Sequence, residues 1–131
     1  MADVVLDACV LINLERGDRR TRLWIEEAVA RGAVLLVAGA TYTEVWKGYR
    51  NGQGYEMSRI LKTVVPVPTN DAVGRRAGEV MEEAGADPTL RFDAIVVATA
   101  AVRNADVVTD DLDDIEYLGA YARVRVLSTA P

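Results

Sequence analysis

The sequence predicts an α/β protein built on a central, mainly parallel sheet of four to five strands. Short apolar runs alternate with longer, helix-like segments along its 131 residues, and this alternation is typical of parallel sheets with right-handed crossovers. Apolar residues make up 50% of the chain, enough to bury one sizeable core. We therefore expect one domain that spans residues 1–131, with no internal repeat or linker.

The first part of the chain alternates between apolar runs and segments that end at glycine. One apolar run ends at Asp7 and another follows Gly32, and both are typical of buried strands. Between them lie two helix-like stretches, which end at Gly17 and Gly32. We expect a strand at Val4–Leu6, helices at residues 10–16 and 20–31, and a second strand at residues 33–38.

The middle of the chain adds two helices and a third strand. Thr41 opens a helix that carries Glu44 and weakens where several glycines follow. Pro66 lies inside the next apolar run, so this strand is short or lies at an edge of the sheet. We expect the first helix to weaken over residues 48–54, the second at residues 55–63, and the strand at residues 64–67.

The last part of the chain continues the alternation. Thr69 or Asn70 can cap a helix. A turn with Pro88 separates it from a stretch that is apolar on most sides, as expected for a helix buried against the sheet. We expect these helices to run to about residue 84 and over residues 91–103, strands at residues 106–109 and 124–127, and a short helix toward Tyr117.

Composition excludes several kinds of catalytic site. The sequence has no histidine, which excludes Ser-His-Asp and Cys-His nucleophilic systems and zinc sites that need imidazole. Its one cysteine, Cys9, can form neither an internal disulfide nor a thiolate cage. Carboxylates remain, and such hard oxygen ligands favour Mg²⁺ or Mn²⁺, ions that suit phosphoryl chemistry.

The chain carries no sign of export or membrane insertion. Its start lacks the basic and apolar regions of a secretory signal, and no apolar run approaches the roughly 20 residues that span a membrane. We therefore expect a cytoplasmic protein without a membrane segment. The formal net charge of −5 argues only weakly against a nucleic-acid partner, because acids that hold a metal ion do not present their full negative charge to a substrate.

Four acids stand where strand-like runs give way to helix-like ones, or where a helix begins. They are Asp7, Glu44, Asp93 and Asp111. In an open parallel sheet such junctions meet at one edge, outside the carboxyl ends of the strands. Two carboxylates roughly 4 Å apart repel by about 4 kcal/mol at an effective dielectric constant of about 20. A cation is needed to hold four of them together, so the positions predict a divalent-metal site.

Each of these acids also has a purely structural explanation. Asp7 can cap the first helix, and Thr41-x-x-Glu44 matches a capping box. Asp93 can interact favourably with the positive end of a helix dipole. The acids of residues 110–114 can form a turn that starts a short helix. Singly these explanations suffice, but capping does not require an acid at every junction.

Four short motifs resemble one known family in order and spacing over nearly the whole chain. They are Val5-Leu6-Asp7 with Val10-Leu11-Ile12, Glu44-Val45-x-x-Gly48, Asp93-Ala94-Ile95-x-x-Ala98-Thr99-Ala100, and Thr109-x-Asp111-x-x-Asp114. This pattern is similar to that of PIN-domain ribonucleases, in particular VapC-type toxins of type II toxin-antitoxin systems. The resemblance implies a three-layer α/β/α fold and a metal-dependent endoribonuclease that hydrolyses RNA phosphodiester bonds.

The resemblance also assigns roles to single residues. It implies that four acids hold Mg²⁺ or Mn²⁺ and carry catalysis, that a further acid follows them, and that a threonine orients their loop through its hydroxyl group. The four acids are Asp7, Glu44, Asp93 and Asp111, the further acid is Asp114, and the threonine is Thr109.

The chain departs from the family pattern at two places. Asp110 stands where the family often has a basic or neutral residue, so either Asp110 or Asp111 can be the fourth ligand, and the spacing favours Asp111. Cys9 stands in the pair of residues after the first Asp, where the family commonly has Ser, Thr or Asn. Asn13 can replace the lost hydrogen bond if its side chain points toward the site.

The resemblance further implies a mechanism and partners. A bound ion would activate a water for in-line attack on the phosphodiester, and Asp93 or Glu44 would accept the proton of that water. The sequence does not decide between one metal ion and two. The implied partners are an RNA such as transfer or ribosomal RNA, a second copy in a homodimer, and a cognate VapB-type antitoxin whose tail sets an Arg or Lys against the acids. Cations that can touch RNA phosphates, or simply form surface ion pairs, are Lys47, Arg50, Arg91 and Arg103.

Three alternatives remain. A receiver-type signalling domain needs a phospho-accepting Asp after a mid-chain strand and a late Lys, whereas Pro68 follows that strand here and no Lys follows Lys62. A haloacid-dehalogenase-like phosphatase needs a second Asp two residues after Asp7, where Cys9 stands. A degenerate PIN domain that binds RNA or protein without cleaving would be marked by a lost ligand, and the sequence has lost none.

Overall fold

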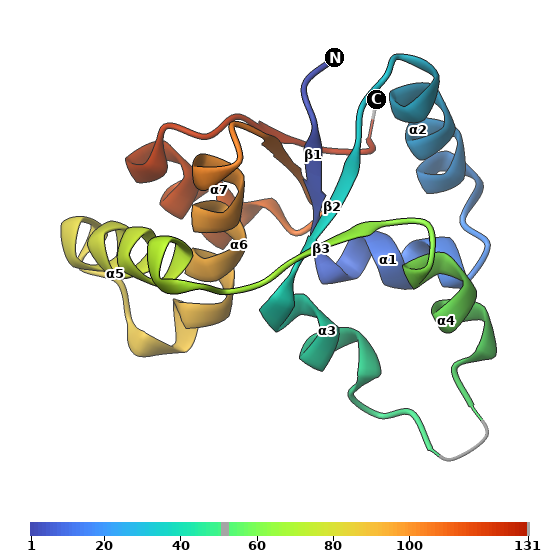
Figure 1. The fold of residues 1–131 in the computed structure, drawn as a ribbon, viewed down its shortest axis with the longest axis horizontal. Coiled ribbons are helices and arrows are strands. Elements are labelled where there is room, and N and C mark those ends of the chain that lie inside the picture. Colours follow the sequence, from blue (N-terminus) through green and yellow to red (C-terminus); the bar gives the residue numbers. More distant parts are fainter. Residues whose placement is uncertain (51–52, 131) are drawn as a thin grey trace.

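A computed structural model describes residues 1–50 and 53–130. Its strands are β1 (Val4–Leu6), β2 (Leu35–Ala38), β3 (Val65–Val67), β4 (Asp106–Val108) and β5 (Val126–Leu127). They form one parallel sheet in the order β3-β2-β1-β4-β5 (Figure 1). The predicted α/β fold with a parallel sheet is therefore confirmed.

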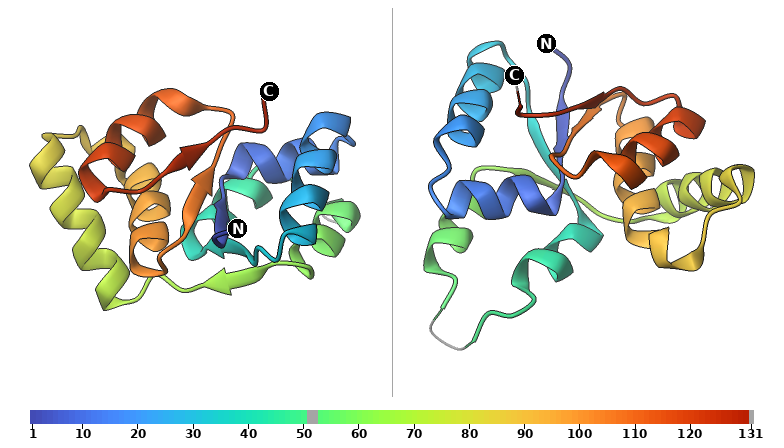
Figure 2. Two further views of the ribbon diagram at one scale, coloured as in Figure 1. Left: turned by 90° about the horizontal axis from the view of Figure 1, so that it is seen from above. Right: turned by 180° about the vertical axis from the view of Figure 1, so that it is seen from behind.

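Helices cover both faces of this sheet. They are α1 (Ala8–Glu15), α2 (Arg19–Ala30), α3 (Gly39–Trp46), α4 (Tyr55–Leu61), α5 (Asp71–Ala84), α6 (Arg91–Val102) and α7 (Leu112–Ala122), with the short 3₁₀ helix η1 (Pro88–Leu90) before α6. α1, α2 and α4 pack on one face together with Val45 of α3, whereas α5, α6 and α7 pack on the other (Figures 1 and 2). This is the three-layer arrangement that the resemblance implied.

The central strand β1 brings distant parts of the chain together. Leu6 at its end pairs with Val108 of β4, so Asp7 and Thr109, which follow these two residues, leave the sheet side by side. The chain passes from β1 to β2 on one side, whereas β4 lies on the other, and open α/β sheets bind ligands where the strand order reverses in this way. The receiver alternative is wrong, because receiver domains have the strand order 2-1-3-4-5.

The alternation of side chains along β1 divides the core into two parts. Val4 and Leu6 pack against the α1 side and Val5 against the α6 side, and all three are fully buried. A strand that is buried on both faces carries apolar residues at successive positions. This burial explains why β1 appears in the sequence as a continuous apolar run.

Three helices differ most from their predicted bounds. α1 begins at Ala8 rather than at residue 10, because Asp7 caps it directly after β1. α3 begins at Gly39, directly after β2, rather than at Thr41. α7 continues to Ala122, beyond the short helix expected toward Tyr117, and its buried residues pack into the same core cluster as those of α5 and α6.

Other local predictions agree with the structure. β3, which contains Pro66, is short and lies at an edge of the sheet. Asn70 caps α5, because its side chain accepts a hydrogen bond from the Val73 N–H at 3.0 Å. Across residues 1–50 and 53–130, we find no helix with the length and apolar character needed to cross a membrane.

Candidate active site

Four separate segments bring acids to the carboxyl edge of the sheet. Asp7 follows β1, Glu44 lies in α3 after β2, Asp93 lies in the first turn of α6, and Asp111 directly precedes α7. Burial raises the pKa of both Glu44 and Asp93, and the negative charge of Asp7 raises the pKa of each further. The predicted acids are therefore close enough to act on one another, with Asp7 as their common neighbour.

Asp7 is the most buried of these acids, with 7% of its surface exposed. Its Oδ1 accepts a hydrogen bond from the Ala8 N–H at 2.9 Å, and its Oδ2 accepts one from the Thr109 hydroxyl at 2.8 Å. Burial raises the pKa of Asp7 although these hydrogen bonds favour its charged form, and the charge of Asp111 raises that pKa further. Asp7 therefore caps α1, as its structural explanation predicts. It also belongs to the acid cluster.

Thr109 connects Asp7 to the loop that carries Asp111. Its hydroxyl group is fully buried, donates to Asp7 and accepts a hydrogen bond from the Asp111 N–H at 3.0 Å. One hydroxyl can do both because it has one proton and two lone pairs. The position of Asp111 is thereby tied to that of Asp7.

The capping-box explanation of Glu44 is wrong. α3 begins at Gly39 and its N-cap, Ala38, makes no side-chain cap, so Glu44 lies well inside the helix. The Oε1 atom of Glu44 is buried and has no hydrogen-bond partner among the described residues, and the same holds for the Thr41 hydroxyl. A buried acceptor without a partner costs about 1–3 kcal/mol, so Glu44 is the acid with the clearest need for a ligand.

Asp93 lies in the first turn of α6, but its surroundings oppose its ionisation. A carboxylate in the first turn of a helix is stabilised by the dipole, which lowers its pKa. Instead, burial and then the charges of Asp7, Asp114 and Asp111 raise the pKa of Asp93 to about 6. The effect of Asp114 also brings this fifth acid, which lies in the first turn of α7, into the cluster.

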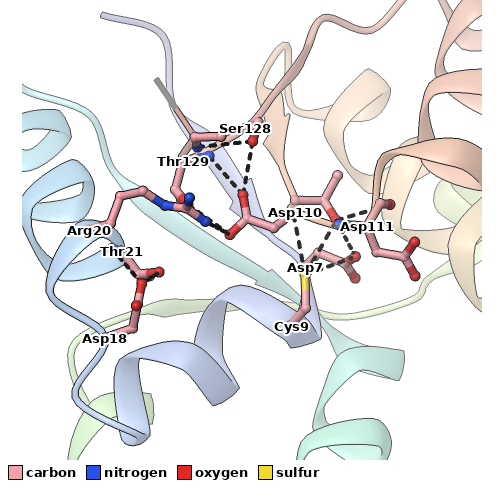
Figure 3. Close-up of polar contacts among 11 residues, drawn as sticks. Asp7, Cys9, Asp18, Arg20, Thr21, Asp110, Asp111, Ser128 and Thr129 are labelled. Atoms are coloured by element: carbon pink, nitrogen blue, oxygen red, sulfur yellow. Dashed lines mark hydrogen bonds and ion pairs between the residues drawn. The ribbon is translucent and has the colours of Figure 1, made fainter.

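The Asp110 side chain points away from the cluster and binds Ser128 and Thr129, which follow β5 (Figure 3). Its Oδ1 accepts hydrogen bonds from the Ser128 hydroxyl at 3.0 Å and the Thr129 N–H at 2.9 Å, and its Oδ2 accepts one from the Thr129 hydroxyl at 2.7 Å. Arg20 approaches the same carboxylate at 4.0 Å. Burial acts to raise the pKa of Asp110, but the hydrogen bonds from Thr129 and Ser128 and the charge of Arg20 hold that pKa below its usual range.

Cys9 is a member of this network that sequence reasoning did not assign. Its Sγ lies 3.4 Å from the Thr109 hydroxyl and 3.8 Å from Asp7 Oδ2, and it accepts a hydrogen bond from the Asp110 N–H at 3.4 Å. The thiol thus stands where a hydroxyl or amide was expected, two residues after Asp7. Asn13 makes no side-chain hydrogen bond within residues 1–50 and 53–130, and its carbonyl accepts from the Asp18 N–H.

The predicted phosphate-binding cations are not all near these acids. Lys47 is close enough to Glu44 to lower the pKa of that carboxyl group, which burial and the nearby acids raise. Arg91 begins α6 near Asp93 and donates to the Pro88 carbonyl at 3.0 Å. Arg103 follows the other end of α6, and a helix of this length spans about 18 Å, so Arg103 lies away from the cluster.

The donor set fits a hard divalent cation. The acids offer only oxygen ligands, and Glu44 Oε1 is a buried acceptor without a partner in the described residues. Within residues 1–50 and 53–130 no three His, Cys, Asp or Glu side chains are already close enough to hold a metal ion. Carboxylates that repel one another move apart without a cation, so an ion would draw these side chains inward.

Comparison with protein families and solved structures agrees with this fold. A family model described as "PIN domain" matches residues 4–119. A search of curated proteins found no match.

Three solved structures illustrate the likeness. VapBC2 from Rickettsia felis bound to a promoter DNA fragment has 13% identity and a TM-score of 0.78, covering 98% of each chain. VapBC-1 from nontypeable Haemophilus influenzae has 19% identity and a TM-score of 0.74, covering 100% of each chain. A toxin-antitoxin complex from Klebsiella pneumoniae has 22% identity and a TM-score of 0.71, covering 86% of this chain and 89% of that one. At these identities the likeness establishes the fold.

Proposed function

The chain belongs to the PIN domain family, and on this premise we propose that it is a metal-dependent endoribonuclease, the toxin of a VapBC-type toxin-antitoxin pair. The observation that carries the proposal is the convergence of acids from four segments at the carboxyl edge of the sheet, with a buried, unpartnered oxygen on Glu44. Family membership alone would leave the activity open, because a fold does not by itself determine a function.

In this proposal Asp7, Glu44, Asp93 and Asp111 hold Mg²⁺ or Mn²⁺. Asp111 is preferred over Asp110, since both carboxylate oxygens of Asp110 already bind Ser128 and Thr129. Asp114 adds negative charge beside Asp93 and acts as a further acid. The ion, when bound, supplies a water of lowered pKa and stabilises charge on the phosphate.

The residues of the chain prepare the site for this chemistry. Thr109 and the Ala8 N–H fix the orientation of Asp7, and Thr109 also holds the backbone at Asp111. The two half-buried acids, Asp93 and Glu44, are the candidates to accept the proton of the attacking water, because burial and neighbouring charges make them better bases than an exposed carboxylate. Lys47, beside Glu44, would receive a phosphate of the RNA backbone.

The proposed partners follow from the similar structures. Two of those described above are VapBC complexes, and one of them is bound to a promoter fragment. By analogy we propose a cognate VapB-type antitoxin for this chain, a homodimer, and a structured RNA such as transfer or ribosomal RNA as substrate.

One observation favours the runner-up, a PIN domain that binds RNA or protein without cleaving it. Within the described residues, the acids do not yet form a cluster tight enough for a metal. The two functions differ in whether Mn²⁺ binds and whether RNA is cut.

The test is an RNA-cleavage assay with Mg²⁺ or Mn²⁺, run beside a measurement of Mn²⁺ binding by calorimetry. Asp7→Asn and Asp93→Asn should abolish both cleavage and tight Mn²⁺ binding, and EDTA should abolish cleavage. Asp113→Asn is the matched control, because Asp113 lies in the same acidic stretch and is exposed. Metal-dependent cleavage that survives in both site variants would reject the proposed metal site. A folded native protein that does not bind Mn²⁺ and does not cut RNA would reject the proposed nuclease function.

A further inference from the structure

A cavity of about 330 Å³ opens beside the acid cluster, between the end of α1 and the end of α3. Glu44 belongs to both the acid cluster and the wall of this cavity. The other residues that matter for its chemistry are Ile12, Glu15, Arg16, Val45, Lys47 and Tyr49. The volume lies at the lower end of the roughly 300–1,000 Å³ of small-ligand sites.

One side of the cavity is apolar and aromatic. Ile12 and Val45 contribute aliphatic surface, and Tyr49 contributes its ring. The ring of Tyr49 packs edge-on against Trp46, with centroids 5.3 Å apart and planes at 69°. A ring held in this way offers a surface on which a planar base can stack.

The charged side chains of the cavity are two carboxylates, Glu15 and Glu44, and two cations, Arg16 and Lys47. The Tyr49 hydroxyl donates to Glu15 Oε1, and this hydrogen bond, with burial and the charge of Glu15, raises the pKa of Tyr49 to about 12. The hydroxyl therefore stays protonated and keeps Glu15 in place, while Glu15 Oε2 has no partner in the described part of the chain. Arg16 and Lys47 line the same cavity, and within residues 1–50 and 53–130 neither forms an ion pair.

We propose that this cavity binds the base of the RNA nucleotide next to the cleaved phosphodiester, and that it selects guanine. The inference rests on the proposed ribonuclease function and names the substrate feature that this site recognises. Glu44 places the cavity directly beside the acids that would hold the metal, so a base bound there has its own phosphate within reach of them.

The choice of guanine follows from hydrogen-bonding chemistry. Single-stranded RNA is recognised by stacking of bases on aromatic side chains and by hydrogen bonds to their Watson–Crick edges. A carboxylate only accepts hydrogen bonds, and guanine is the base whose Watson–Crick edge presents two adjacent N–H donors. Glu15 matches that edge, Tyr49 and Ile12 cover the faces of the ring, and Arg16 and Lys47 are placed for phosphates.

Binding without catalysis tests this inference separately from cleavage. Four uracil octamers that carry G, A, C or U at one central position are titrated in EDTA and low salt, and affinity is read from fluorescence anisotropy. We expect the guanine octamer to bind about tenfold more tightly than the others, the size of one good bidentate contact. Glu15→Gln should remove this preference, and Glu82→Gln, a change at an exposed acid of α5, should keep it.

A cleavage arm then locates the cut sites in a random RNA pool with Mn²⁺. Cuts enriched beside guanine in the native protein, and no longer enriched in Glu15→Gln, support the inference. Cleavage without a base preference, or a preference unchanged in Glu15→Gln, overturns it while the proposed function stands. Guanine-selective binding without cleavage supports the subsite and rejects the nuclease. Equal binding of all four octamers overturns the inference and favours a side chain of a protein partner as the occupant.

Discussion

The Thr109 hydroxyl donates a hydrogen bond of 2.8 Å to Asp7 Oδ2, across 102 residues of sequence. The contact exists because β1 and β4 are neighbours whose last residues pair with each other. It fixes one acid directly and, through the Asp111 N–H, the backbone of a second. Much of the geometry of the candidate site therefore depends on one buried hydroxyl group.

Thr109→Val should weaken both the fold and the site. The change preserves shape but removes the hydroxyl that donates to Asp7 Oδ2 and accepts from the Asp111 N–H, a loss of about 1–3 kcal/mol for a buried group. We expect a lower free energy of unfolding in urea and a loss of Mn²⁺ affinity. Thr99→Val is the matched control, because Thr99 is equally buried but donates only to the Ile95 carbonyl. Equal Mn²⁺ affinities in the two variants would show that Thr109 has a structural role alone.

Asp110→Asn and Asp111→Asn should affect different properties, the first stability and the second metal affinity. Asp110 accepts hydrogen bonds from Ser128 and Thr129, so its neutralisation should destabilise the protein by about 1.5–3 kcal/mol, the scale of hydrogen bonds to charged groups. Asp111 is exposed, so its neutralisation should leave stability nearly unchanged and reduce Mn²⁺ affinity. Calorimetric metal binding and urea denaturation measure the two quantities. The assignment of the fourth ligand would be reversed if Asp110→Asn alone lost the metal.

These two neighbouring acids show where sequence reasoning stopped. The alternation of elements, the edge position of β3 and the meeting of the acids could all be predicted, because apolar periodicity and parallel strand direction determine them. The direction of the Asp110 side chain could not, since it depends on Thr129, a residue 19 positions away that no local pattern connects to it. The capping-box interpretation of Glu44 fails for a similar reason. The motif was present, but α3 begins directly after β2.

Cys9 shows a different kind of limit. Its position two residues after Asp7 departs from the family pattern. The sequence does not predict which hydrogen bonds a thiol forms at this position. Only the approach of Thr109 and the Asp110 N–H, at 3.4 Å each, reveals that the sulfur fills the gap. Strand order likewise could not be predicted, because it depends on which crossovers lie on which face.

Divalent metal should stabilise the folded protein. The acids repel one another in its absence, and an ion that binds only the folded state adds about 2.7 kcal/mol at one hundred times its dissociation constant. We expect Mn²⁺ to raise the melting temperature of the native protein and of Asp113→Asn, and to leave that of Asp93→Asn nearly unchanged. Melting is followed by circular dichroism with and without EDTA. An equal rise in all three proteins would indicate binding elsewhere on the molecule.

The metal-free protein should lose stability as the pH rises from about 4 to about 6. Burial and then the charges of Asp7, Asp114 and Asp111 raise the pKa of Asp93 to about 6, whereas an Asp in an unfolded chain titrates near 3.9. A raised pKa in the folded state favours folding while the group is protonated, and this contribution is lost as the pH rises through the folded value.

The pKa values of Asp7 and Glu44 are also raised, chiefly by burial, so these two acids act in the same direction. The lowered pKa of Asp110, which its hydrogen bonds hold down against burial, affects stability only at more acidic pH. Urea denaturation in EDTA at several pH values measures the trend. Asp93→Asn, which cannot ionise, should flatten the fall, and Asp113→Asn should retain it. If the free energy of unfolding falls as steeply in Asp93→Asn as in the native protein, Asp93 is not the group that responds to pH. The repulsion at the carboxyl edge of the sheet then lies among the other acids.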